Sequence, residues 1–348
     1  MNLPVVALLF GGPSEEYEIS LRSAAHILEC IDPDRFSVLP VGITRFGGWF
    51  RCAPDPDMIR RDEWFCHCDR HIPVTPCRGG LLLPDASASF LRPAAVFPAL
   101  HGAWGEDGRL QGLLDCLSVP YVGCGQEASA LCMNKAMTKA VLRCAGLPVT
   151  DWTEIGPADM DDPEGLLRRV TATLPLPLFV KPCHGGSSIG AAPVRSDAEL
   201  IPALREALLH DGRALIEPLI DALECEVAVL CCEGETVVSR PGAILTDETF
   251  YHYRAKYSDP RTRTVVPAPL PEEAAQEMRR LAKAAFTALG CRHLARVDFF
   301  FSKSDKQIFI NEINTLPGMT ERSLWPTLME DCGISFRDCL TRLVGAAV

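Results

Sequence analysis

Lysine is sparse in this chain, and three of its lysines stand where phosphate chemistry can use them. The chain has 27 arginines against seven lysines, and no lysine comes before Lys135. Lys181 ends an apolar run before a glycine-rich loop, and Lys256 lies in an aromatic segment. A compact ammonium serves phosphate oxygens as a point charge where a broad guanidinium does not fit. For any one of these lysines chance is the better explanation, so only the set points to phosphate.

The loop after Lys181 is a candidate phosphate cradle. Residues 181–190 read Lys-Pro-Cys-His-Gly-Gly-Ser-Ser-Ile-Gly, and such small residues let successive backbone N–H groups approach an anion. The lysine precedes the glycines, so the segment is not a P-loop, and no G-x-G-x-x-G dinucleotide motif follows the first predicted strand. Alone, the loop would be a simple turn at least as often as a nucleotide site.

Three oxygen-bearing side chains fall on two predicted strands near the end of the chain. Asp298 lies on one strand, while Glu312 and Asn314 lie two residues apart on the next and therefore share a face. Carboxylate and amide oxygens suit Mg²⁺ carried by nucleotide phosphates better than Zn²⁺. Strand-end carboxylates that simply face water are the alternative, and without the lysines we would prefer it.

Three more polar, glycine-rich clusters each follow a predicted strand, at residues 11–16, 101–108 and 314–320. Ligand sites in open α/β sheets form outside the carboxyl ends of the strands, so these loops are expected to meet a substrate. A single glycine turn would mean little, and His101 taken alone is compatible with a structural histidine.

The elements that must position these loops are predicted from the apolar runs. Val5–Phe10, Val38–Ile43 and Val96–Leu100 alternate with helical or turn-rich stretches, which predicts a parallel sheet with crossover helices. A helix capped by Ser20 should follow the first strand. Residues 44–92 are expected to be irregular.

The rest of the chain predicts two further blocks, with a boundary near residue 123. The second block should contain a helix that ends at Gly146, a strand at Leu178–Lys181, and a helix that starts with a Ser196–Glu199 capping box and closes at Gly212. The third block should contain one helix and three strands, at Pro271–Leu289, Cys225–Leu230, Arg296–Phe301 and Ile308–Glu312.

Composition limits the classes of protein to which the chain can belong. Its 348 residues, 47% hydrophobic and 23% charged, predict a folded protein of two or three domains. The 45 acidic against 34 basic residues give a formal charge of −11, which repels polyanions, so no nucleic-acid partner is expected. No apolar run reaches the roughly 18 residues of a membrane span, so no membrane partner is expected. Without an export signal, the sixteen cysteines are interpreted as reduced thiols of a cytoplasmic protein.

Taken together and in this order, the motifs resemble those of the D-alanine:D-alanine ligases of the ATP-grasp superfamily, including the related ligases of vancomycin resistance. The resemblance covers nearly the whole chain. It is carried by Gly11-Gly12-x-Ser14-x-Glu16, Leu100-His101-Gly102 through Gly105-Glu106-Asp107-Gly108, Gly112, Lys181-Pro182, Gly186-Ser187-Ser188, Ala255-Lys256-Tyr257, and Asn311-Glu312-x-Asn314-Thr315-x-Pro317-Gly318.

This resemblance implies an α/β and α+β protein with the three-domain ATP-grasp fold, whose N-terminal domain is Rossmann-like. The domains would cover residues 1–123, 124–217 and 218–348, with a mobile lid at about 251–266. The implied reaction joins two D-alanines for peptidoglycan: the first carboxylate attacks the γ-phosphate of ATP, and the second amine displaces phosphate from the acyl phosphate. Two Mg²⁺ ions are implied, with Mn²⁺ as a substitute, and family members are commonly homodimers.

The resemblance also assigns nucleotide and metal contacts. The lysines among them would meet phosphates, the segment from Glu217 to Ile220 would edge the adenine, and Glu224 would take the ribose hydroxyls. The implied nucleotide contacts are Lys135, Phe179, Lys181, Ser187, Glu217, Ile220, Glu224, Phe250 and Phe300, and the implied metal ligands are Asp298, Glu312 and Asn314.

On the amino-acid side, the resemblance implies that Glu16 holds the first ammonium and, through Ser187 and Tyr257, ties the first domain to the lid. Arg296 and the N–H of Gly318 would stabilise the oxyanion. The full implied set consists of the catalytic residues Glu16, Ser187, Lys256, Tyr257, Arg296 and Gly318 and the substrate-binding residues His101, Ser323 and Leu324, with Ser323 on the second carboxylate and Lys256 on the transferring phosphate.

The second substrate leaves alternatives open. An apolar Leu324 suits the methyl group of D-alanine better than a hydroxyl, although an apolar pocket rejects an added hydroxyl only weakly. The alternatives are a D-alanine:D-serine ligase, another ATP-grasp carboxylate–amine ligase and, from a different class, a nucleotide-binding regulator without activity.

Overall fold

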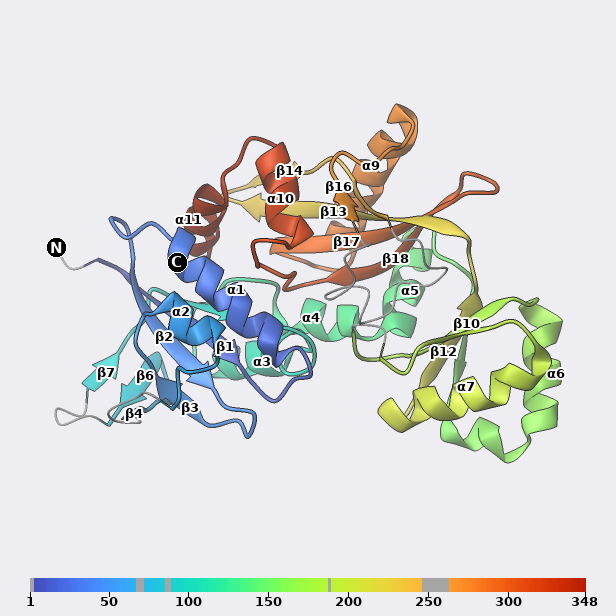
Figure 1. Cartoon of the computed structure of the whole chain (residues 1–348), viewed down its shortest axis with the longest axis horizontal. Helices are drawn as coiled ribbons and strands as arrows, with labels where there is room; N and C mark the ends of the chain where they lie inside the picture. Colours follow the sequence, from blue (N-terminus) through green and yellow to red (C-terminus); the bar gives the residue numbers. More distant parts are fainter. Residues whose placement is uncertain (1–2, 67–71, 85–88, 187–188, 246–262) are drawn as a thin grey trace.

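The computed structural model describes residues 3–66, 72–84, 89–186, 189–245 and 263–348. Figure 1 shows a blue α/β group of elements at one end, a green and yellow group at the other, and the orange C-terminal sheet between and above them. Each group is built on its own sheet, which we name the N-terminal, the central and the C-terminal sheet. A parallel α/β layer joined to antiparallel sheets is the fold class predicted from the sequence.

The first part of the chain forms the N-terminal sheet and a small second sheet. Its elements are β1 (Val5–Gly11), α1 (Tyr17–Cys30), β2 (Ser37–Ile43), β3 (Trp49–Arg51), α2 (Pro56–Arg60), β4 (Ile72–Pro73), β5 (Thr75–Cys77), β6 (Gly80–Leu83), β7 (Ser89–Leu91), β8 (Ala95–Ala99) and α3 (Arg109–Cys116). The N-terminal sheet has the order β4-β3-β2-β1-β8, and β2, β1 and β8 are parallel. These three strands confirm the three predicted from apolar runs, which are typical of parallel strands covered on both faces.

The prediction that Ser20 caps a helix is wrong, because α1 begins three residues earlier at Tyr17. Ser20 is buried inside the helix, where its hydroxyl accepts the Gly11 N–H (2.7 Å) and donates to the carbonyl of Ala99 (2.5 Å). Both partners end strands of the N-terminal sheet, and a strand end that is buried needs such a partner. The serine therefore ties the helix to the sheet.

The prediction that residues 44–92 are irregular is also wrong for much of the described part. β3 and β4 extend the N-terminal sheet, and β5, β6 and β7 form the small sheet. Asp55 caps α2, because its carboxylate accepts the N–H of Met58 at 3.0 Å. These strands are two to four residues long, too short for an apolar period to reveal them.

The middle of the chain forms the central sheet, in the order β11-β10-β12-β9. The strand predicted at Leu178–Lys181 is confirmed as β10. The single helix predicted before Gly146, however, is two helices in the structure. They break at Asn134, whose side chain accepts the N–H of Met137 at 3.0 Å and so caps the second helix. The elements are α4 (Gln126–Met133), α5 (Lys135–Cys144), β9 (Thr153–Ile155), the 3₁₀ helix η1 (Pro157–Asp161), α6 (Pro163–Thr173), β10 (Leu178–Pro182), β11 (Ala192–Val194), α7 (Asp197–His210) and β12 (Ala214–Pro218).

Ser196 and Glu199 meet at the start of α7, but not as the predicted capping box. The carboxylate of Glu199 accepts the N–H of Arg195 and the hydroxyl of Ser196, both at 2.8 Å. The serine hydroxyl therefore donates to a charged acceptor instead of accepting a helix N–H, and α7 ends at His210, before the predicted Gly212.

The C-terminal sheet confirms the three predicted strands and the predicted long helix. Its order is β16-β15-β13-β17-β18, with β14 also paired to β13. The elements are β13 (Ala222–Cys232), β14 (Glu235–Val238), β15 (Gly242–Leu245), β16 (Arg263–Val265), α9 (Glu272–Ala288), β17 (His293–Ser302), β18 (Ile308–Asn314), α10 (Leu324–Asp331) and α11 (Phe336–Ala347). The buried face of α9 includes Met278, Leu281, Ala285 and Phe286.

The N-terminal and C-terminal sheets share one hydrophobic core. Its buried side chains come from β1 and α1 and also from β13, β17, α10 and α11. The central sheet has a core of its own with α6 and α7. α4 and α5 contribute Cys132 and Leu142 to the core under α9, so they pack on the C-terminal sheet. The first and last thirds of the chain thus form one packed body.

Within the described residues, no helix is long and apolar enough to cross a membrane. The cysteines of that part of the chain form no disulfide.

His293 links the two sheets of this body, and its burial predicts sensitivity to acid. Its Nδ1 accepts the N–H of Gly123 at 3.1 Å. Burial, followed by the charge of Arg292, lowers the pKa of His293 to about 4. Between pH 6.5 and 4 the unfolded chain therefore binds a proton that the folded chain does not, so stability should fall as the pH falls through that window.

We expect His293→Gln to lose less stability than the wild type over this window, by about 1–2 kcal/mol after allowing for screening by solvent. The amide oxygen of glutamine can still accept the Gly123 N–H but does not titrate. Thermal melts of both proteins from pH 7.5 to 4.5 measure the difference, and parallel Tm curves would contradict the role of this histidine.

Candidate active site

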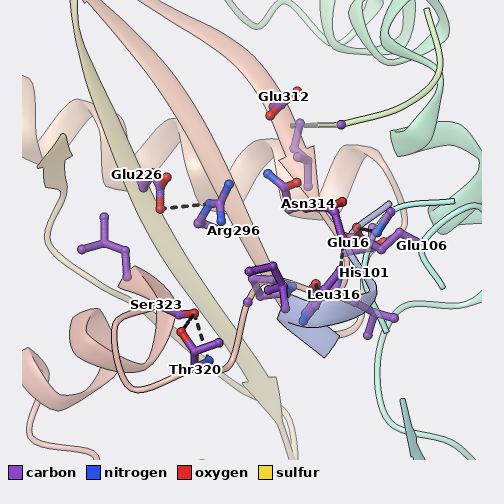
Figure 2. A pocket seen from close by; sticks show the side chains of 18 of the residues that line it. Glu16, His101, Glu106, Glu226, Arg296, Glu312, Asn314, Leu316, Thr320 and Ser323 are labelled. Carbon is purple, nitrogen blue, oxygen red and sulfur yellow. Dashed lines mark hydrogen bonds and ion pairs between the residues drawn. The ribbon is translucent and has the colours of Figure 1, made fainter. Parts of the chain in front are cut away.

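A cavity of about 820 Å³ lies where the N-terminal and C-terminal sheets meet. Four of the loops singled out in the sequence line it, through Glu16, through residues 101–106, through Gly185 and Gly186, and through residues 314–320. Figure 2 shows Glu16, His101 and Glu106 on one side, Glu226 on the opposite side with Arg296 between them, and Ser323 and Thr320 below. The structure therefore gathers loops that lie up to 300 residues apart around one space.

His101 and Glu106 build the N-terminal wall of this cavity. Nε2 of His101 is 2.8 Å from the hydroxyl of Ser23, and its Nδ1 is 3.0 Å from the carbonyl of Leu316. Both ring nitrogens thus have protein partners, and the ring joins α1 to the loop after β18. Burial lowers the pKa of His101, so the ring is neutral.

Glu106 ties the same two loops together. Its carboxylate accepts the N–H of Gly102 at 2.6 Å and the N–H of Leu316 at 3.3 Å. Burial, and then the neighbouring Glu16, raises the pKa of Glu106 to about 8. Glu106 therefore holds the loops of Gly102 and Leu316 together through its two oxygens.

Glu16 lies in a narrow gap between Gly102, in the loop after β8, and Gly186, in the loop after β10. A Cβ atom on Gly102, whose φ is +70°, would lie 2.7 Å from Oε2 of Glu16, and one on Gly186 would lie 3.6 Å from the same atom. Gly102 is therefore required both for its left-handed backbone and for the space that the carboxylate fills. Glu16 reaches both walls of the cavity, as its proposed role on the first ammonium requires.

Arg296 is held between two carboxylates in the middle of the cavity. Its guanidinium donates to both oxygens of Asp298 at 2.7 Å and lies 3.0 Å from Glu226. Burial disfavours the charged guanidinium, but the two carboxylates outweigh it and raise the pKa of Arg296. Asn314 also donates to Asp298, at 3.0 Å. Arg296 is thus fixed in place as a permanent positive charge.

The three predicted metal ligands lie together on β17 and β18. Asp298 pairs in register with Glu312, next to a bulge in the ladder, and Asn314 follows two residues on. Within the described ranges no group of three or more His, Cys, Asp or Glu side chains gathers to hold a metal. Two carboxylates and one amide oxygen fit a hard cation that takes further oxygens from a bound phosphate or from water.

Lys135 joins this cluster from the first turn of α5. Its Nζ lies 3.8 Å from Glu312 and donates to the carbonyl of Gly185. The backbone N–H of Lys135 also donates to the carbonyl of Cys183 at 2.9 Å. The predicted phosphate lysine therefore connects the metal-ligand strand to the glycine-rich loop.

Lys181 is buried beside this loop. Its Nζ donates to the side-chain oxygen of Asn311 at 3.1 Å and lies 2.6 Å from Glu217. Asn311 precedes Glu312, a residue of the cavity wall. Lys181 is thus placed one residue away from Glu312 through its contact with Asn311, although it is not itself among the residues that line the cavity.

On the opposite wall, the segment before α10 forms a polar turn. The hydroxyl of Ser323 accepts the N–H of Thr320 at 2.9 Å and lies 2.8 Å from the Thr320 hydroxyl. A Cβ on Gly318 would come within 2.8 Å of the Ser323 hydroxyl oxygen. Leu324 follows, buried on the first turn of α10. Gly318, Ser323 and Leu324 all line the cavity.

The remaining nucleotide-side predictions fall on the central and C-terminal sheets. Phe179 pairs in register with Glu217 between β10 and β12, and Glu224 pairs with Phe300 between β13 and β17. Ile220 lies half-buried in the link between those sheets. Ser187, Phe250, Lys256 and Tyr257 lie outside the described residues, as does the predicted lid except for residues 263–266, of which 263–265 form β16.

Sequence reasoning did not assign a role to three residues that the structure places at this site: Glu106, Lys139 and Glu226. Glu226 lies two residues after Glu224 on the same strand face and opposite Asp298 in register. Two acids in an otherwise apolar strand were a usable signal for it. Lys139 lies one helical turn after Lys135, so the two lysines share a face of α5, and this spacing was the signal that could have pointed to Lys139.

Two family models match the chain and together cover most of it. Residues 5–124 match the model described as "D-ala D-ala ligase N-terminus", and residues 141–345 match "D-ala D-ala ligase C-terminus".

Curated relatives match over nearly their whole length. A "D-alanine--D-alanine ligase" of Thermoanaerobacter sp. (strain X514) is 40% identical over 354 residues, which is 100% of this chain and 97% of the relative. Another of the same name, from Chlorobaculum tepidum, is 40% identical over 99% of this chain and 96% of the relative.

Solved structures match as completely. The VanG D-Ala:D-Ser ligase from Enterococcus faecalis is similar with a TM-score of 0.90 and 34% identity over 100% of both chains. The D-alanine-D-alanine ligase from Coxiella burnetii is similar with a TM-score of 0.86 and 33% identity, over 99% of this chain and 95% of that one.

Proposed function

We propose how this site works from one premise: the chain belongs to the D-alanine–D-alanine ligase family and has the ATP-grasp fold. It is an ATP-dependent ligase that joins two D-alanines into D-alanyl-D-alanine through an acyl phosphate, for the synthesis of peptidoglycan precursors. The observation that carries the mechanism is the convergence of Glu16, Arg296, Glu312 and Ser323 on one cavity. ADP release that depends on D-alanine tests it.

In the first step, the carboxylate of the first D-alanine attacks the γ-phosphate of ATP. Glu16 would hold the ammonium of that D-alanine, while Lys135 and Lys181 would hold the phosphates. A phosphoryl group transfers through a loose transition state, so positioning and neutralisation of charge provide most of the catalysis. Alignment of the reacting groups alone can supply about 7–11 kcal/mol.

In the second step, the amine of the second D-alanine attacks the acyl phosphate and phosphate leaves. Arg296 and the N–H of Gly318 would stabilise the oxyanion of the tetrahedral intermediate. Ser323 would bind the second carboxylate, and His101 would keep the wall of the cavity in place through Ser23 and Leu316. Ser187, Lys256 and Tyr257 belong to the same proposal, with a lid over residues 251–266 that excludes water from the acyl phosphate.

We propose that Asp298, Glu312 and Asn314 hold two Mg²⁺ ions, for which Mn²⁺ substitutes. Bound there, the ions neutralise phosphate charge during transfer. Phe179, Glu217, Ile220, Glu224, Phe250 and Phe300 are proposed to surround the adenosine part of ATP. Further proposals are domains at residues 1–123, 124–217 and 218–348, a cytoplasmic location and a homodimer.

D-alanine is the proposed second substrate, although one similar structure is a D-Ala:D-Ser ligase. Leu324 is buried, and a Cβ on Gly242 would lie 3.0 Å from its Cδ2, so the side chain packs tightly against β15. An apolar wall there offers no partner to the hydroxyl of D-serine, which costs free energy when it is buried unpaired.

With equal concentrations of D-alanine and D-serine, we expect D-alanyl-D-alanine to exceed the mixed dipeptide by about tenfold or more, the size of discrimination that one hydroxyl allows. Mass spectrometry of the products measures the ratio, and D-alanine alone serves as the control. Preferential formation of D-alanyl-D-serine would overturn the specificity but not the ligase reaction.

A further inference from the structure

Lys139, Glu217 and Lys181 form a buried cluster of three charges next to the cavity. The side chains of Lys139, Glu217 and Lys181 are 1%, 3% and 9% exposed. Lys181 lies 2.6 Å from one oxygen of Glu217, and Lys139 lies 2.9 Å from the other. Thr150 completes the cluster, because its hydroxyl donates to Glu217 at 3.0 Å and its oxygens accept from Lys139.

The cluster carries one net positive charge. Within the described residues, Glu217 is the sole carboxylate that forms an ion pair with either lysine. Arg143, one helical turn after Lys139 on α5, has Asp151 as its own partner at 2.8 Å. Burial raises the pKa of Glu217, but the two lysines outweigh it and lower that pKa to about 2, so the carboxylate is charged. A buried net charge is costly unless a counterion approaches it.

Geometry indicates where that counterion binds. The ammonium of Lys139 is enclosed between α5, Thr150 and Glu217, and its Nζ lies 5.8 Å from the ring of Trp152. Lys181 instead lies at the end of β10, where it contacts Asn311 beside the cavity wall. An anion can therefore approach Lys181 but not Lys139, although the charge that attracts it belongs to both.

We infer that Lys139 is a positioning residue for the nucleotide: it neutralises Glu217 from behind, and so leaves the charge of Lys181 uncancelled for the phosphates of ATP. Without Lys139, Glu217 and Lys181 would form a neutral pair, and the net positive charge that attracts the phosphates would be lost. This role rests on the proposed binding of phosphate by Lys181.

The direct test is the binding of ADP to the full-length protein by isothermal titration calorimetry, for wild type and for Lys139→Met, Glu217→Gln and the double variant. We expect Lys139→Met to weaken ADP binding at least about tenfold. Loss of one net positive charge a few ångströms from the phosphates lowers the affinity about several-fold to a hundredfold. In the Glu217→Gln background there is no carboxylate to cancel, so the same substitution should change affinity less than about threefold.

A purely structural lysine predicts the opposite pattern. If Lys139 only supports packing, Lys139→Met weakens ADP binding equally in both backgrounds, and that result overturns the inference. Wild-type affinity in Lys139→Met overturns it too. Arg143→Met is the matched control, because it removes a neighbouring cation whose ion-pair partner is a different carboxylate, that of Asp151. This variant should bind ADP like the wild type.

Two further variants keep the outcomes separate. If Lys139→Met does not fold in a thermal melt, Lys139→Gln takes its place, because its amide can still donate to Thr150 or Glu217 without a charge. Lys181→Ala reports on the proposed function itself: if it binds ADP like the wild type, phosphate binding by Lys181 is wrong. If Lys139→Met binds ADP like the wild type while Lys181→Ala binds it more weakly, only the role of Lys139 is refuted.

Discussion

Lys181→Ala is expected to lower ADP release at saturating D-alanine about 10²–10³-fold. The substitution removes an ammonium from the phosphate site, and a single preorganised group of this kind is worth about 10²–10³ in rate. It also removes one of the two lysines that pair with the buried carboxylate of Glu217. A coupled assay of ADP release, with kcat and KM for ATP determined separately, measures the loss.

Glu312→Gln is the companion variant on the other side of the phosphate site. It keeps the shape of the side chain but removes a charge that lies 3.8 Å from Lys135. We expect a loss of about 10²-fold or more, since a proposed metal ligand loses its charge. Lys283→Ala, on the exposed face of α9, is the matched control and should keep wild-type activity. No ADP release by the wild type would support the nucleotide-binding regulator instead, and wild-type rates in both variants would contradict the proposed phosphate and metal roles.

Arg296→Met is expected to damage both catalysis and stability. It removes the guanidinium proposed to stabilise the oxyanion, for which we expect a loss of about 10³-fold in kcat. It also leaves Asp298 and Glu226 buried without their shared cation, and breaking a buried ion pair costs about 3–5 kcal/mol. Urea unfolding and ADP release, measured on the same preparation, separate the two effects.

Two controls make this result specific. Arg240→Met breaks an exposed pair with Asp331 that has distances of 2.6 and 2.9 Å. It should change the free energy of unfolding by less than about 1 kcal/mol and leave activity intact. The double variant Arg296→Met/Glu226→Gln should recover part of the stability but none of the activity. Recovery of activity in the double variant would show that Arg296 serves only to balance charge.

Several local predictions depended on patterns within a few residues, and these are the ones that the structure confirms. The strands β1, β2, β8, β10, β13, β17 and β18 were found from apolar runs, because burial of a strand shows directly in its own residues. Asp298 and Glu312 were expected as neighbours because adjacent strands with polar ends suggested a pair, and their register confirms it.

The local predictions that failed did so because a side chain had another partner. Ser20 was expected at a helix start, but its hydroxyl contacts Gly11 and Ala99, which are 9 and 79 residues away. The predicted Ser196–Glu199 capping box does not form, because the two side chains hydrogen-bond to each other instead. In each case a polar group found a better partner than the one that propensity favours.

The sequence by itself determined the family, most of the longer strands and the loops that line the cavity, since short motifs and apolar periods reveal those features. Only the tertiary structure decided the ion pairs. Arg296 lies between Glu226 and Asp298, and Lys139 shares Glu217 with Lys181, through contacts that span up to 78 residues. Such pairing depends on distance and burial in the folded chain, and these are not encoded in any local pattern.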